Sequence, residues 1–283
     1  MSHAHILTLS CPDKPGIVHA VTGVLAAHNL NILDLQQFSD RDSETFFMRV
    51  HFGPTETAST AFLAAPFDAL ARDFAMTYAL HPVDRKVRLL IMVSKTGHCL
   101  NDLLFRVKTG QLHADVPLVV SNHPDFGDLV RSFGVAFVHL PVTKDTKAAQ
   151  ETRILELIRE HDVGLVVLAR YMQVLSPTLC TAMTGRIINI HHSFLPSFKG
   201  AKPYHQAYDR GVKLIGATAH FVTADLDEGP IIEQGVVRVD HSMGAKALVD
   251  EGSNVESQVL AAAVKGYAEH KVFLNGTKTV VFH

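Results

Sequence analysis

Cysteine is scarce in this chain of 283 residues, which contains only three. Cys11, Cys99 and Cys180 lie far apart in the sequence and form no C-x-x-C pair. Disulfide frameworks and structural zinc sites are built from closely spaced cysteines, so the sequence argues against both. Reduced thiols in a cytoplasm fit this pattern best, and we expect a cytoplasmic protein.

An excess of charge of one sign is also absent. The 26 Lys and Arg residues and 28 Asp and Glu residues leave a net charge of -2, and no dense basic run occurs. Nucleic acids and anionic membranes attract basic surfaces, so we expect neither as a partner. No apolar run approaches the roughly 18 residues that span a bilayer. The first residues lack both a basic segment and a long apolar one, so no signal peptide is predicted.

Several motifs of nucleotide and metal chemistry are missing as well. The sequence contains no G-x-G-x-x-G, no G-x-x-x-x-G-K-[ST] and no H-E-x-x-H. Adjacent histidines rarely ligate one ion together, so we expect no metal. The segment "SKTGHCLND", residues 94–102, places Gly97 before a helix, where an anion could bind, but this signal is weak alone.

Apolar residues are abundant, at 47% of the chain. In the N-terminal part of the chain, the spacing of these residues indicates short strands and helices. "HILTLS" alternates as a strand does, and Val18, Val21 and Leu25 recur on one helix face. A second helix is expected within residues 56–75. The order β-α-β-β-α-β predicts a ferredoxin-like domain, which we place at residues 1–83.

The spacing of apolar residues changes in residues 84–283, which we expect to form a second domain. "VRLLIMVS", "VPLVVSN", "VGLVVLAR" and "GRIINIH" are near-continuous apolar runs, as strands buried on both faces are. Helical segments alternate with them, which predicts an α/β fold with a mostly parallel sheet and crossover helices. Near the C terminus, Asn275-Gly276 between apolar arms predicts a hairpin.

Two polar residues stand at the end of one predicted strand, in "IINIHH". Ligands of open parallel sheets bind outside the carboxyl ends of the strands. The amide of Asn189 could polarise a carbonyl, and His191 could move a proton near neutral pH. Strand alternation puts these two side chains on one side and sends His192 elsewhere. Two turn residues with satisfied hydrogen bonds would fit the same spacing equally well.

A second polar cluster lies in "AHFVTADLDEGPII". His220 ends an apolar run, and Asp225, Asp227 and Glu228 precede a Gly-Pro turn. A carboxylate in such a loop could orient a histidine or a water molecule. Taken alone, an ordinary solvated acidic turn is the simpler interpretation.

Three long blocks carry a resemblance: "VVLARYMQVLSP", "RIINIHHSFLPSFKGAKPYHQAYDRG" and "GATAHFVTADLDEGPIIEQ". Together they resemble the formyltransferase-fold enzymes that use 10-formyltetrahydrofolate, over roughly residues 86–283. The resemblance implies a Rossmann-like domain with Asn189, His191 and Asp227 as the catalytic residues. It also implies these substrate-binding residues: Arg170, Tyr171, Met172, Gln173, Val174, Leu175, His192, His220, Val222 and Thr223.

The N-terminal part resembles an ACT domain through "CPDKPGIVHAVTGVLAAHNLNILDLQQ", with its D-x-P-G turn and N-I-x-D step. ACT domains commonly bind small effectors, often amino acids, at contacts between subunits. The implied effector residues are Asp13, Pro15, Gly16, Asn31 and Ile32, and the resemblance also suggests a homo-oligomer.

An ACT domain fused to a formyltransferase fold is the arrangement of the formyltetrahydrofolate deformylases. This resemblance implies hydrolysis of 10-formyltetrahydrofolate to formate and tetrahydrofolate, with no cofactor besides this substrate. It also implies that the product formate supports purine synthesis and that the reaction balances one-carbon folate pools.

Two departures from the transferase pattern fit the deformylases: His192 replaces a proline, and "SKTGHCLND" replaces a glycine-rich phosphate loop. Two alternatives remain, a transferase that formylates an amine and a non-catalytic folate or amino-acid sensor. The intact catalytic trio argues against the sensor.

Overall fold

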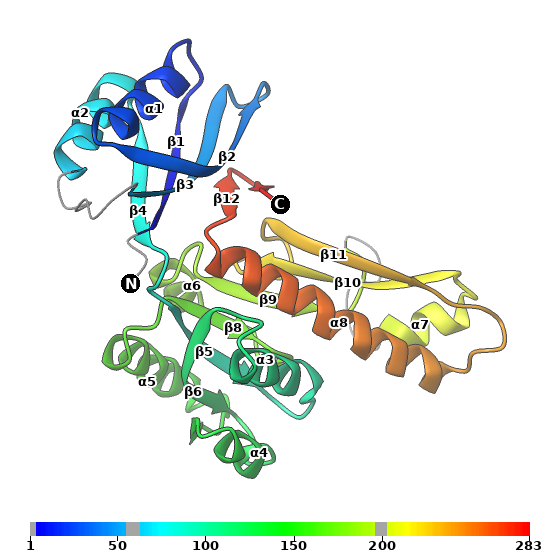
Figure 1. Ribbon diagram of the computed structural model, residues 1–283. Helices are drawn as coiled ribbons and strands as arrows, with labels where there is room; N and C mark the ends of the chain where they lie inside the picture. Colours follow the sequence, from blue (N-terminus) through cyan, green and yellow to red (C-terminus); the bar gives the residue numbers. More distant parts are fainter. Residues whose placement is uncertain (1–3, 55–62, 196–202) are drawn as a thin grey trace. The chain divides into compact units, whose positions relative to one another are not determined.

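The computed structural model describes residues 4–54, 63–195 and 203–283, and the chain divides into two compact units (Figure 1). The first unit comprises Met1–Lys86, His270–Asn275 and Val280–His283, and the second comprises Val87–Glu269 and Gly276–Thr279. The division expected from the sequence lies after residue 83 and leaves the C-terminal residues in the second domain. The compact units instead divide after Lys86, and most of the C-terminal tail belongs to the first unit.

The first unit has the predicted order β-α-β-β-α-β. Its elements are β1 (His5–Pro12), α1 (Ile17–Ala27), β2 (Leu30–Asp40), β3 (Thr45–Pro54), α2 (Ala64–Phe74) and β4 (Thr77–Pro82). The strands form an antiparallel sheet in the order β2-β3-β1-β4. The second helix begins at Ala64 in the described chain, and residues 55–62 of the predicted segment lie outside the described residues.

Alternation along the strands builds the core of this unit. Leu7 and Leu9 of β1 are 0% and 1% exposed and pack with Val21 and Leu25 of α1 and with Phe67 of α2. Removing such side chains from water stabilises the fold by about 1.5–3 kcal/mol each. The apolar residues that the sequence spaces at strand and helix periods therefore pack together in one core.

The C-terminal tail completes this unit. It forms the predicted hairpin, β12 (Val272–Asn275) and β13 (Lys278–Val281), with Gly276 in the left-handed region at φ 59°. The ring of His270 stacks on that of His81 at 3.6 Å between centroids, and Phe273 meets Phe47 edge to face.

We expect the free energy of unfolding to fall as the pH drops below about 6.5. Burial, aided by His81 and Arg49, lowers the pKa of His270 to about 3, and burial also lowers the pKa of His81. The unfolded chain binds these protons near pH 6.5, so the contribution is present above that pH and is lost as the pH falls towards the folded values.

Urea unfolding at pH 7, 6 and 5 measures this effect, which should be on the order of 1 kcal/mol after allowance for partial solvent exposure. The His270→Asn variant cannot titrate there and tolerates the left-handed backbone that His270 has at φ 54°. Its stability should vary less with pH, and an identical slope in both proteins would contradict the assignment.

The second unit is an α/β domain with a mostly parallel sheet, as predicted. Its elements are β5 (Val87–Val93), α3 (His98–Lys108), β6 (Ala114–Ser121), α4 (Gly127–Ser132), β7 (Ala136–His139), α5 (Lys147–Glu160), β8 (Leu165–Leu168), α6 (Pro177–Ala182), β9 (Ile187–His191), α7 (Pro203–Asp209), β10 (Leu214–Phe221), β11 (Ile231–Arg238) and α8 (Ala245–Ala268). The strand order is β11-β10-β9-β8-β5-β6-β7.

Strands β7, β6, β5, β8 and β9 are parallel, whereas β10 and β11 join the other edge in antiparallel fashion. The central strands are apolar throughout because helices cover both faces of the sheet, and Leu89–Val93 are all 0% exposed. The carboxyl end of β9 therefore lies beside the carboxyl end of β8 on one side and beside the middle of an antiparallel strand, β10, on the other.

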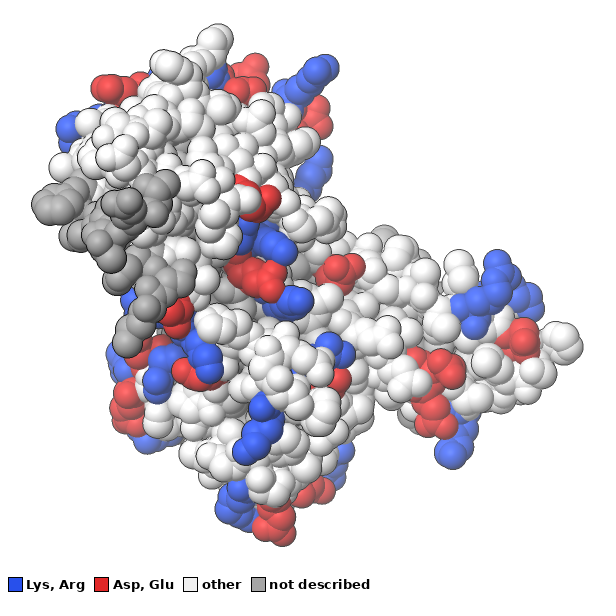
Figure 2. Space-filling model, in the orientation of Figure 1, with Lys and Arg blue, Asp and Glu red and all other residues white. Residues whose placement is uncertain are grey.

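The surface carries both signs of charge. Figure 2 shows basic and acidic side chains interspersed on the visible face, with no broad area of one sign among the described residues there. Among residues 4–54, 63–195 and 203–283, none of the helices has both the length and the apolar character that a membrane span requires.

Candidate active site

The pairing of β9 with β10 gathers polar side chains on one side of the sheet. Asn189 lies directly opposite His220, and His191 lies opposite Thr218. Facing residues of an antiparallel pair project to the same face, and residues two apart on a strand do as well. Asn189, His191 and His220 therefore share one face at the end of β9.

The loop between β10 and β11 brings Asp227 to these residues. Asp227 has a left-handed backbone with φ 57°, which turns the loop sharply. The loop then passes so close to β10 that a Cβ atom on Gly229 would lie 1.7 Å from the carbonyl oxygen of Phe221. Only glycine permits this approach, and the Phe221 N–H donates to the Pro230 oxygen at 2.9 Å.

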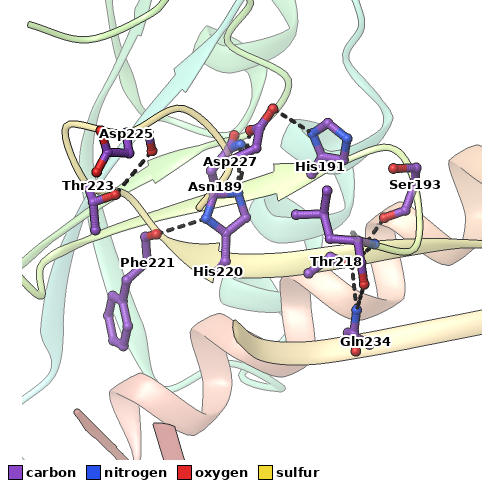
Figure 3. A network of polar contacts seen from close by, with 11 residues as sticks. Asn189, His191, Ser193, Thr218, His220, Phe221, Thr223, Asp225, Asp227 and Gln234 are labelled. Atoms are coloured by element: carbon purple, nitrogen blue, oxygen red, sulfur yellow. Dashed lines mark hydrogen bonds and ion pairs between the residues drawn. The ribbon is translucent and has the colours of Figure 1, made fainter. Parts of the chain in front are cut away.

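Two histidine side chains converge on the Asp227 carboxylate, as Figure 3 shows. His191 Nδ1 lies 3.3 Å from Oδ2, and His220 Nε2 lies 3.7 Å from Oδ1. Hydrogen bonds from His191 and then His220 outweigh burial and hold the pKa of Asp227 well below its usual range. Asp227 is therefore a carboxylate at neutral pH.

The two histidine rings differ in their remaining hydrogen-bond contacts. His220 Nδ1 lies 2.8 Å from the Phe221 oxygen, and its Nε2 lies 3.3 Å from Asn189 Nδ2. His191 Nε2 is buried and has no hydrogen-bond partner among the described residues. Buried polar atoms are nearly always paired, so a substrate atom or a water molecule is the expected partner of this nitrogen.

These residues line a cavity of about 790 Å³, a volume typical of small-molecule sites. All of the catalytic and substrate-binding residues predicted from the sequence line it: Arg170, Tyr171, Met172, Gln173, Val174, Leu175, Asn189, His191, His192, His220, Val222, Thr223 and Asp227. One part of the wall is apolar and solvent-exposed, with Met172, Val174 and Leu226 at 58%, 53% and 63% exposure. Such a wall suits a flat heterocycle.

His192 lines the same cavity as His191, whereas strand alternation sends it elsewhere. The reason is that β9 ends at His191, so alternation no longer fixes the next side chain. The two rings meet edge to face at 5.0 Å. Burial, together with the charges of Arg170 and His191, lowers the pKa of His192 to about 4, so this ring is neutral at pH 7.

A buried acid in the cavity wall was missed by the sequence analysis. Glu256 of α8 is 1% exposed; the Tyr204 hydroxyl donates to its Oε1 at 2.6 Å, and His98 Nε2 lies 2.9 Å from its Oε2. Burial alone would raise the pKa of Glu256, but the contacts with His98, Arg170 and Tyr204 lower it overall. The available signal was a lone acid beside Val255 on the buried face of a long helix.

Glu256 also belongs to a group that could hold a metal ion, since donor atoms of His98, Cys99 and Glu256 lie within 4.8 Å of one another. Burial raises the pKa of the Cys99 thiol, which therefore stays protonated. Arg170 Nε lies 3.5 Å from Glu256 Oε2 and already supplies a positive charge. Both features disfavour a cation at this position.

The predicted effector residues of the first unit fall into two separate places. Asp13, Pro15 and Gly16 form the turn after β1, whose last residue pairs with Thr45 at one end of β3. Asn31 and Ile32 pair with Gly53 and Phe52 at the other end of β3. A single chain therefore does not bring the two groups together.

Comparison with known proteins gives two family matches: residues 87–264 match the formyl transferase family, and residues 5–61 match the ACT domain family. A formyltetrahydrofolate deformylase from Corynebacterium sp. (strain P-1) is 52% identical, and the match covers 98% of this chain and 97% of that protein.

Two solved structures extend the comparison. The crystal structure of formyltetrahydrofolate deformylase from Burkholderia mallei ATCC 23344 is 53% identical, with a TM-score of 0.96, and covers 99% of this chain and 100% of that one. Glycinamide ribonucleotide transformylase 1 from Symbiobacterium toebii is 31% identical, with a TM-score of 0.65, over 70% of this chain and 95% of its own.

Proposed function

The chain belongs to the formyltetrahydrofolate deformylase family, and from this premise we infer that it hydrolyses 10-formyltetrahydrofolate to formate and tetrahydrofolate. The observation that carries the proposal is the meeting of Asn189, His191 and Asp227 at one cavity, with His191 Nε2 left without a partner among the described residues. The alternative, formyl transfer to an amine, is not favoured by the full-length similarity to deformylases.

The geometry supports a general acid–base mechanism through a tetrahedral intermediate. The pterin ring lies against the apolar wall that includes Met172, Val174 and Leu226. Asn189 Nδ2 donates to the formyl oxygen as it gains negative charge. His191, held through Nδ1 by Asp227 at 3.3 Å, stabilises that charge and carries a proton through Nε2.

The proposed reaction consumes one water molecule and needs no other co-reactant. The water oxygen attacks the formyl carbon while Asp227, ionised at neutral pH, orients the water and takes up its proton. Collapse of the intermediate breaks the bond between the formyl carbon and N10. The proton returns to N10 through His191, leaving formate and tetrahydrofolate.

Formate release without an amine tests this function directly. We expect formate and tetrahydrofolate to appear in equal amounts, with oxygen-18 from labelled water in the formate. Glycinamide ribonucleotide should neither accept the formyl group nor compete with the substrate. Efficient formylation of that amine, or formate without label, would instead support the transferase.

The ACT domain binds a small amino acid at a contact between two copies of the chain. Support comes from the separation of the two predicted residue groups along β3, which a second copy can bridge. Strand β2 is an edge strand, and Leu33 and Phe38 on it are 55% and 46% exposed. Exposed apolar residues on a sheet edge favour pairing with another chain, so the protein is a homo-oligomer.

Calorimetric titration with each of the twenty amino acids tests the effector proposal. One small amino acid should bind and change turnover, and substrate should change its affinity by the same factor. Gly16 has φ 94°, so a Gly16→Ala variant distorts the turn and should weaken that binding. Absence of both binding and any activity change for all twenty would exclude the proposal.

We also propose a cellular setting for this reaction. The enzyme is cytoplasmic, where its three buried cysteines stay reduced, and it needs no cofactor besides its folate substrate. Its product formate feeds one-carbon steps of purine synthesis, and the reaction returns tetrahydrofolate to the pool.

A further inference from the structure

A continuous row of side chains leads from the catalytic carboxylate to the buried acid of α8. Asp227 contacts His191, and His191 meets His192 edge to face. The His192 ring meets the Tyr204 ring at 6.3 Å, and the Tyr204 hydroxyl donates to Glu256. The apolar wall formed by Met172, Val174 and Leu226 comes from other loops, so the cavity has a second, polar wall beside His192.

This polar wall, the Glu256 cluster, consists of Tyr204, Glu256, His98 and Arg170. Two groups face the same oxygen of its carboxylate: Glu256 Oε2 lies 3.5 Å from Arg170 Nε and 2.9 Å from His98 Nε2. The hydroxyl of Tyr204 and both oxygens of Glu256 are engaged within the cluster. Tyr204, His98 and Glu256 therefore hold one another, whereas Arg170 Nε faces Glu256 without a hydrogen-bond partner among the described residues.

The cluster is also closely packed against the backbone of α8. A Cβ atom on Gly252 would lie 2.1 Å from Cζ of Tyr204, so the ring lies directly on the helix. Arg170 has φ 65°, a conformation that a residue with a side chain adopts at an energetic cost. The Arg170 side chain is nevertheless only 15% exposed and its Nε faces Glu256, which indicates that surrounding contacts hold it there.

We propose that the Glu256 cluster closes the side of the cavity beside His192 to nucleophiles larger than water, and so selects water as the formyl acceptor. Tyr204 supplies the closing surface, and Glu256 holds Tyr204, His98 and Arg170 in place. The inference rests on the proposed hydrolysis of a formyl group. Specificity then arises by exclusion: an amine meets the bulky Tyr204 ring, whose hydroxyl is already paired with Glu256.

Competition between water and hydroxylamine tests the proposal with the full-length enzyme. In the competing step the hydroxylamine nitrogen bonds to the formyl carbon, the bond from that carbon to N10 breaks, and a proton moves from hydroxylamine to N10. The products are formohydroxamate and tetrahydrofolate. The ratio of formohydroxamate to formate, at equal release of tetrahydrofolate, reports the choice of acceptor independently of overall turnover.

Removing the Tyr204 ring should raise the ratio of formohydroxamate to formate, whereas a variant that keeps the ring should leave the ratio close to that of wild type. For wild type we expect formate almost alone, and for Tyr204→Ala a ratio at least about tenfold higher. Tyr204→Phe keeps the ring and should stay within about threefold of wild type. Tyr208→Ala, on the same helix but 48% exposed and outside the cavity, is the matched control and should leave the ratio unchanged.

Glu256→Gln keeps the size of the side chain, and it tests the role of the cluster in acceptor choice if Tyr204→Ala does not fold. Loss of the charge releases Arg170 and His98, so the ratio should rise. An unchanged ratio in the folded variant, or a raised KM alone, would overturn the proposal and make the cluster a substrate-binding element. Wild type that makes no formate without an amine would instead refute the hydrolase function itself.

Discussion

Replacing Asp227 by asparagine is expected to leave the fold intact and to lower kcat about 10²–10⁴-fold. The carboxylate lies 3.3 Å from Nδ1 of His191 and 3.7 Å from Nε2 of His220, and it is ionised at neutral pH. Asparagine has almost the same shape but no charge, so it neither stabilises a protonated His191 nor takes a proton from water. Release of tetrahydrofolate measures the loss, and the thermal unfolding midpoint checks the fold.

Asp250→Asn is the matched control, because Asp250 is an acid of α8 that is 66% exposed and lies 3.9 Å from Lys246 on the same helix. This variant should retain wild-type kcat. If Asp227→Asn also retained near-normal turnover, the assignment of Asp227 to the catalytic residues would be wrong. A large fall in the unfolding midpoint would instead mean that Asp227 acts mainly on the loop structure.

Replacing Asn189 by alanine should lower kcat about 10²–10³-fold, the usual effect of losing one donor to a developing oxyanion. Asn189 is half-buried, and its Nδ2 lies 3.3 Å from His220 Nε2, so the amide is held on the face that carries His191. The exposed Asn101→Ala variant on α3 is the control and should behave as wild type.

The double variant Asn189→Ala, Asp227→Asn should lose less activity than the product of the two single losses. Groups that act on one transition state do not contribute independently, so removal of the first reduces what the second can add. Strictly multiplicative losses would indicate that Asn189 and Asp227 act in separate steps.

Strand patterns in the sequence pointed to residues that line the cavity in the structure. The apolar run ending in Asn189 and His191 identified the end of a buried strand, and such an end is a binding position in an open sheet. The same pattern could not distinguish catalytic residues from turn residues. Which of these side chains meet at the cavity depends on the antiparallel register of β10, which sets His220 opposite Asn189, and on the left-handed turn at Asp227.

Features that depend on tertiary contacts could not be predicted from the sequence patterns. Helices α4, α6 and α7 have six, six and seven residues, too few for a clear helical period, although Ser176 and Pro177 mark the start of α6. Glu256 is an ordinary helical residue until folding brings Tyr204 and His98 to it. The separation of the effector residues likewise follows from α1 running back along the sheet before β2 begins.

The placement of residues 270–275 and 280–283 in the first unit has a consequence for synthesis of the chain. Phe47 and His81 of the first unit can meet their partners Phe273 and His270 only after the intervening residues of the second unit, Val87–Glu269, have been synthesised. All the residues of the second unit's sheet emerge from the ribosome before those partners. The first unit is therefore completed only after the second unit's sheet has been synthesised, and a fragment ending at Lys86 would expose the surface of Phe47 and His81 that Phe273 and His270 cover.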